Sequence, residues 1–77
     1  MRIERLVTMA NDIATYFAVE PDHATAVNGV RDHLRRFWEP GMRRQLKEHS
    51  LAHDGEGLLP LAREAVDALE MPRNDAA

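Results

Sequence analysis

The residues best suited to binding chemistry lie in the segment 33–46, HLRRFWEPGMRRQL. Two arginine pairs, 35–36 and 43–44, flank the adjacent aromatic residues Phe37 and Trp38. Guanidinium groups bind phosphates and carboxylates through paired hydrogen bonds, and they stack on aromatic rings. The segment could therefore grip a nucleic-acid backbone, or it could form the contact surface of a subunit in a larger assembly.

Other residue types offer little catalytic chemistry. The chain has no cysteine, Ser50 is its only serine, and its four glycines form no phosphate-binding loop. His49 and His53 are four residues apart, as in helical zinc-binding pairs, but no third ligand follows at a recognisable spacing. The sequence therefore predicts no catalytic site, no metal site and no cofactor bound by this chain.

The charge distribution bears on the choice between nucleic acid and protein. Between residues 31 and 47, six basic residues face two acidic ones, whereas the whole 77-residue chain carries a net charge of −3. Proteins that depend on phosphate contacts usually carry net positive charge, and the helix that would enter the major groove begins with Pro40 and offers Gln45 alone to base edges. A small helical nucleic-acid-binding regulator remains the alternative reading.

A protein partner fits the same segment better, because Trp, Arg and Met are enriched at interface centres. Phe37 and Trp38 are adjacent, so on a helix they point about 100° apart, and one can serve the core while the other leans outward. A structural reading, in which both rings seal the core and the arginines are solvated, stays open. The predicted partner-binding residues are Arg35, Arg36, Trp38, Met42, Arg43 and Arg44.

The elements that must position these residues are helices. Apolar residues recur at helical spacing, and period-2 alternation is absent. Helices are expected at about 2–18, 22–38, 40–52 and 58–70, with boundaries at the prolines. The fold class is therefore all-α, a compact bundle of three to four short helices. Residues 1–70 would form a single domain, followed by a flexible tail at 71–77.

Within these helices the spacing makes several finer predictions. Tyr16 is expected to widen the apolar stripe of the first helix, and Phe37 belongs to the apolar face of the second. Gly29 interrupts the second helix, which indicates close packing against a neighbour. The third helix is weakly apolar, with Met42, Leu46 and either His49 or Leu51 expected inside.

The length of the chain makes a partner plausible on physical grounds. A domain of this size buries only about 60 to 65% of its unfolded surface, and without cysteine it has no disulfide to compensate. The N-terminus has no long apolar run, so neither a signal peptide nor a membrane span is expected. We therefore expect a cytoplasmic chain that is stabilised by close packing of its helices or by binding to another protein.

Three blocks in this sequence resemble a known family. They are residues 9–21 (MANDIATYFAVEP), 33–46, and 58–69 (LLPLAREAVDAL), and together they resemble the delta subunit of soluble, NAD-dependent molybdenum formate dehydrogenases. The central block is the most specific. One departure is Gly41, which follows the proline where an arginine is expected, so one charge of the basic run is missing.

The resemblance implies a non-catalytic accessory subunit that binds the large alpha subunit and supports molybdenum cofactor insertion or complex stability. It also implies beta and gamma subunits in the same complex. The cofactors of such a complex are bis-molybdopterin guanine dinucleotide, iron–sulfur clusters, FMN and NAD, all carried by the other subunits. Direct contact between the arginines and the anionic dinucleotide stays open.

Overall fold

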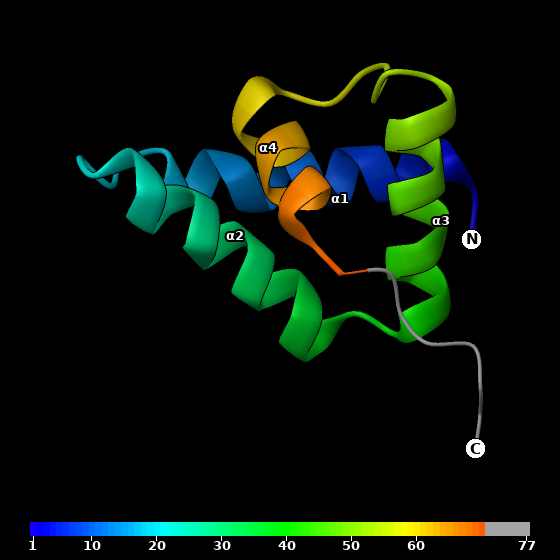
Figure 1. Ribbon diagram of the computed structural model, residues 1–77, viewed down its shortest axis with the longest axis horizontal. Helices are drawn as coiled ribbons and strands as arrows, with labels where there is room; N and C mark the ends of the chain where they lie inside the picture. Colours follow the sequence, from blue (N-terminus) through cyan, green and yellow to red (C-terminus); the bar gives the residue numbers. More distant parts are fainter. Residues whose placement is uncertain (71–77) are drawn as a thin grey trace.

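The fold is a bundle of short helices connected by tight links. The computed structural model describes residues 1–70 and contains no strand in that range, which confirms the all-α prediction. The predicted flexible tail, residues 71–77, lies outside the described residues. The helices are α1 (Ile3–Phe17), α2 (His23–Phe37), α3 (Pro40–Ala52) and α4 (Pro60–Ala68), as labelled in Figure 1.

The helix boundaries follow the local chemistry of the chain. Asp22 caps α2, because its side chain accepts hydrogen bonds from the main-chain N–H of Thr25 at 3.0 Å and from the Thr25 hydroxyl at 2.6 Å. Pro40 and Pro60 occupy the first turns of α3 and α4, where a missing N–H costs no intrahelical hydrogen bond. The boundaries predicted from proline are confirmed, although α4 is shorter than predicted at both ends.

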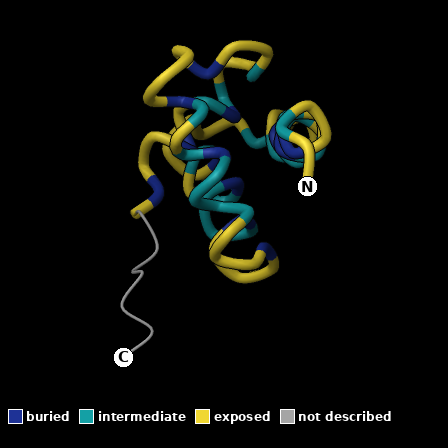
Figure 2. Tube along the Cα trace, turned by 90° about the vertical axis from the view of Figure 1, so that its right-hand side faces the viewer, coloured by how far each residue is buried: buried dark blue, intermediate teal, exposed yellow. Residues whose placement is uncertain are grey.

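The core forms where α1 packs against the other three helices, and α4 also packs against α2 and α3. Figure 2 shows short buried bands alternating with exposed ones along the chain, as expected for amphipathic helices. The buried apolar cluster consists of Leu6, Ala10, Ala14, Val30, Leu34, Trp38, Leu46, Ala62, Ala65, Val66 and Leu69.

Gly29 lets α1 and α2 approach each other closely. A Cβ atom at Gly29 would lie 2.5 Å from Cδ1 of Phe17 and 2.6 Å from Cε1 of the same ring. No side chain fits there without displacement, so the predicted close packing at this glycine is confirmed. Beyond this contact α2 diverges from α1 toward its C-terminal end (Figure 1).

Three positions differ from the amphipathic pattern. Tyr16 and Phe37 were expected on apolar faces, but the structure leaves them 74% and 70% exposed. Phe37 is the last residue of α2, at the end of that helix that has diverged from α1 (Figure 1). On α3, Leu51 is 68% exposed, whereas Ser50 is buried and donates a hydrogen bond to the Asp67 carboxylate of α4.

Candidate functional site

The predicted contact residues gather where α2 ends and α3 begins. Only two residues, Trp38 and Glu39, separate the last residue of α2 from the first of α3. This short link brings the arginine pairs 35–36 and 43–44 within about one helical turn of the same bend. We call this region the basic–aromatic corner, and its members are Arg35, Arg36, Phe37, Trp38, Met42, Arg43 and Arg44.

The two aromatic residues of the basic–aromatic corner have opposite environments. Trp38 is 6% exposed and belongs to the buried cluster, whereas Phe37 is 70% exposed. Met42 is half-buried and packs against the same cluster as Trp38. The aromatic ring that the corner presents at the surface is therefore that of Phe37, and Trp38 contributes to the corner from within the core.

Arg43 is committed to the end of α2. Its Nη1 donates to the main-chain oxygen of Arg35 at 3.0 Å, to that of Leu34 at 3.5 Å, and to that of Trp38. The Leu34 oxygen also accepts the Trp38 N–H at 3.1 Å, and the negative end of the helix dipole attracts a cation to this group of carbonyls. Arg43 thus fastens α3 to the C-terminus of α2.

Lys47 does the same for α4. Its Nζ donates to the main-chain oxygens of Val66 at 3.0 Å and Asp67 at 2.6 Å, near the end of that helix. Residues 43 and 47 are four apart on α3, so they project from one face of the helix. Two cations of the basic segment therefore stabilise the fold from α3.

Arg35 and Arg36 remain at the surface. Their side chains are 61% and 69% exposed, and both pair with Asp32, at 3.5 Å and 3.6 Å respectively. Because one carboxylate is shared by two guanidinium groups, this end of α2 keeps a net positive charge. Exposed pairs of this kind are worth about 0–1 kcal/mol, so either arginine can exchange its partner at little cost. Arg44 is half-buried and engaged in an interaction of its own.

A groove between α1 and α2 adjoins the corner. Its volume is about 450 Å³, and its walls are formed by Asp12, Ile13, Tyr16, Phe17 and His33. The His33 ring contacts that of Phe37, with centroids 4.8 Å apart, so the groove and the corner are continuous. The sequence pattern placed Tyr16 beside the apolar stripe of the first helix and assigned no role to His33. The position of His33 beside the groove could have been predicted from the four-residue spacing of positions 29, 33 and 37, which places them on one flank of α2.

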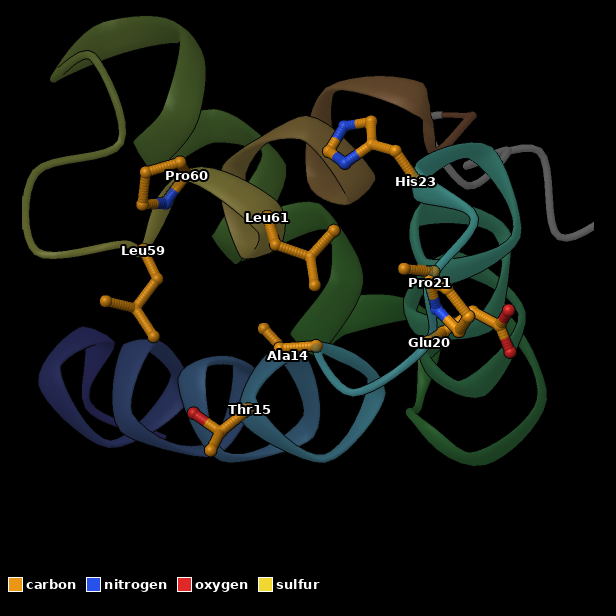
Figure 3. A pocket seen from close by; sticks show the side chains of 10 residues that line it. Ala14, Thr15, Glu20, Pro21, His23, Leu59, Pro60 and Leu61 are labelled. Atoms are coloured by element: carbon orange, nitrogen blue, oxygen red, sulfur yellow. The ribbon is translucent and has the colours of Figure 1, made fainter.

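A second cavity lies between the end of α1 and the starts of α2 and α4. It measures about 480 Å³ and is mainly apolar, and Figure 3 shows Leu59, Pro60 and Leu61 of the α4 side around it. His23 also lies in the wall of this cavity (Figure 3), and its Nε2 atom is 2.5 Å from Oε2 of Glu64. Both side chains are largely exposed, and the hydroxyl of Thr15, in the same wall, donates to the main-chain oxygen of Asn11 at 2.9 Å.

His49 of α3 and His53, which follows the last residue of that helix, lie close together. The rings of His49 and His53 have centroids 5.6 Å apart, and Nε2 of His49 lies 2.8 Å from the main-chain oxygen of Glu56. Among residues 1–70, no group of three or more His, Cys, Asp or Glu side chains is placed to hold a metal ion.

The described helices were also compared with the length and hydrophobicity that a membrane-spanning helix requires, and none of them reaches both.

Comparison with known proteins bears on the resemblance predicted from the three sequence blocks. No curated protein and no solved structure matches the chain. A family model described as "NADH-dependant formate dehydrogenase delta subunit FdsD" matches residues 5–66, which cover all but the first two residues of α1, all of α2 and α3, and most of α4. The match confirms the resemblance, and the chain belongs to the family of NADH-dependent formate dehydrogenase delta subunits.

Proposed function

We propose that this chain is a non-catalytic accessory subunit of a cytoplasmic formate dehydrogenase complex and binds the large, molybdenum-carrying alpha subunit. Beta and gamma subunits would belong to the same complex. By docking on the alpha subunit, the chain would support insertion of the molybdenum cofactor or the stability of the complex. The observation that carries the proposal is the exposed Phe37 ring beside two arginines that share one carboxylate.

The energetics of this surface favour a protein partner. Burying a phenylalanine side chain stabilises a complex by about 1.5–3 kcal/mol, and Phe37 has most of its surface still to bury. Arg35 and Arg36 would each gain a carboxylate from an acidic partner surface without losing a strong partner in the free chain. An aromatic anchor flanked by arginines is a common composition for the centre of an interface.

The remaining members of the basic–aromatic corner support this contact from inside the chain. Trp38 and Met42 pack the bend against the core, and Arg43 ties α3 to the last turn of α2. We therefore propose that Arg35, Arg36 and Phe37 touch the partner directly. Trp38, Met42 and Arg43 would hold these three in position, and Arg44 would lie at the edge of the contact.

The same geometry disfavours direct binding of the cofactor by this chain. Neither of the two cavities described above has an arginine in its wall, so neither is suited to enclose the phosphates of a guanine dinucleotide. We propose that the molybdenum cofactor, iron–sulfur clusters, FMN and NAD are all held by the other subunits. The nucleic-acid alternative is disfavoured by the net charge of −3, because proteins that depend on phosphate contacts usually carry net positive charge.

Co-expression with the alpha subunit tests the proposal. The double variant Arg35→Glu/Arg36→Glu should fail to co-purify with a tagged alpha subunit at physiological salt. The two substitutions make the net charge of the contact more negative by four units, and this contact would then be repelled by an acidic surface on the partner. A matched control, Arg2→Glu/Arg5→Glu, makes the same charge change at exposed positions near the N-terminus. Equal recovery of both variants in the complex would overturn the proposed contact.

A further inference from the structure

We propose that the groove between α1 and α2 receives an amphipathic helix of the alpha subunit, with an acidic flank on the α2 side. This inference rests on the proposed function and names the element that docks. We call this site the aromatic groove; it consists of the groove walls, Asp12, Ile13, Tyr16, Phe17 and His33, together with Phe37, which contacts His33.

The floor of the aromatic groove is formed before any partner arrives. Phe17 is held against Gly29, where no Cβ could be accommodated, so its ring has little freedom to move toward α2. The Tyr16 ring meets Phe17 edge-on with centroids 5.1 Å apart, and His33 contacts Phe37 at 4.8 Å. A preformed site loses less conformational entropy on binding than one that must be assembled.

The rims of the aromatic groove expose large aromatic surfaces. Tyr16 and Phe37 stand on opposite helices and are both more than two-thirds exposed. Aromatic side chains bury about 150–250 Å² each when covered, and an apolar surface of this kind beside a groove marks an interaction site. A helix laid between two diverging helices presents a ridge of apolar side chains to such a groove, which is a common mode of peptide recognition.

The charges around the aromatic groove select the flanks of that helix. Arg36, three residues after His33, lies about 60° from it around α2 and pairs with Asp32, whereas Asp12 forms part of the α1 wall. A docked helix with carboxylates facing α2 pairs with Arg36, while the same carboxylates facing α1 would meet Asp12. The charge asymmetry therefore specifies an acidic flank and its orientation, which distinguishes this occupant from a purely apolar one.

A photo-cross-linking experiment on the assembled complex identifies the occupant. The photoreactive residue p-benzoylphenylalanine replaces Tyr16 in one sample and the exposed Leu51 of α3 in a control. Irradiation should join position 16, but not position 51, to a peptide of the alpha subunit that contains apolar residues at helical spacing and at least one Asp or Glu. A cross-link from position 16 to a second copy of this chain, or to a peptide without acidic residues, overturns the inference.

An affinity measurement separates failure of the groove from failure of the proposed function. Tyr16→Ser should weaken binding to the alpha subunit roughly tenfold or more, as expected for an aromatic hot spot, whereas Leu51→Ser should leave it unchanged. Circular dichroism melting of the free chains is the control that both variants fold. If the wild type does not bind the alpha subunit, the proposed function fails. If the wild type and Tyr16→Ser bind equally well, the groove assignment alone fails.

Discussion

Arg43 donates a hydrogen bond to the main-chain oxygen of Arg35, 3.0 Å away, although both residues belong to the same positively charged corner. The contact is possible because the Arg43 guanidinium meets the backbone of α2, where the carbonyls at the helix end carry partial negative charge. Arg43 thus fastens the bend, whereas Arg35 and Arg36 stay at the surface. The basic segment divides into a structural part and an exposed part.

Arg43→Ala should lower the free energy of unfolding by about 1.5–3 kcal/mol, because hydrogen bonds from a charged donor to partly buried carbonyls are lost. Arg35→Ala serves as the control and should change stability by less than about 1 kcal/mol, since it removes only an exposed ion pair. Urea denaturation followed by circular dichroism measures both. Equal stability of the two variants would contradict the capping role of Arg43.

Gly29→Ala should destabilise the fold by about 1–3 kcal/mol, because the new methyl group overlaps the Phe17 ring. This loss opposes the gain of about 1 kcal/mol that alanine brings to a helix interior, so the sign of the effect is itself informative. Gly41→Ala is the matched control. No atom lies within 4 Å of the Cβ that alanine would add there, so the stability of the fold should rise slightly. Thermal melting of both variants decides the point, and a stabilised Gly29→Ala would rule out the tight contact.

The adjacent residues Phe37 and Trp38 should respond in opposite ways to truncation. Trp38→Ala removes a large side chain from the buried cluster and should cost about 3–5 kcal/mol of stability. Phe37→Ala removes an exposed ring and should change the stability of the free chain by no more than about 0.5 kcal/mol. Chemical denaturation of the isolated chain measures both values, and a large loss for Phe37→Ala would show that this ring belongs to the core.

Asp22 should give the fold a dependence on acid pH. Hydrogen bonds from the Thr25 side chain and then from its main-chain N–H lower the pKa of the Asp22 carboxyl below its ordinary value of 3.8. A lowered pKa in the folded state means that the stabilisation is present above the ordinary pKa, and is lost as pH falls through the lowered one.

Two substitutions of Asp22 distinguish the effect of its negative charge from the effect of its helix-capping hydrogen bond. Asp22→Asn keeps an oxygen that can cap α2, so it should preserve most stability at neutral pH while removing this part of the loss in acid. Asp22→Ala should lower stability at neutral pH because the cap itself is gone. Melting temperatures of the three proteins between pH 2 and 7 test this, and parallel pH profiles for the wild type and Asp22→Asn would refute the assignment.

The sequence by itself determined the elements of this protein. The helix positions and the boundary at Pro40 were predictable, because each depends on residues near one another in the chain. The close approach at Gly29 was predictable because glycine is unfavourable in a helix interior and therefore marks a tight contact. The three sequence blocks also indicated the family that the comparison confirms. Local stereochemistry and helical periodicity are sufficient for such features.

Only the tertiary structure decided which residues face outward. Periodicity left Phe37 and Trp38 open as core or surface, and it placed Tyr16 beside an apolar stripe that proved to end at an uncovered flank. It also left Arg43 indistinguishable from Arg35. Each of these outcomes depends on the angle between α1 and α2 and on where α3 comes to rest. Such positions are set by packing between segments far apart in the chain, which the local pattern of residues does not encode.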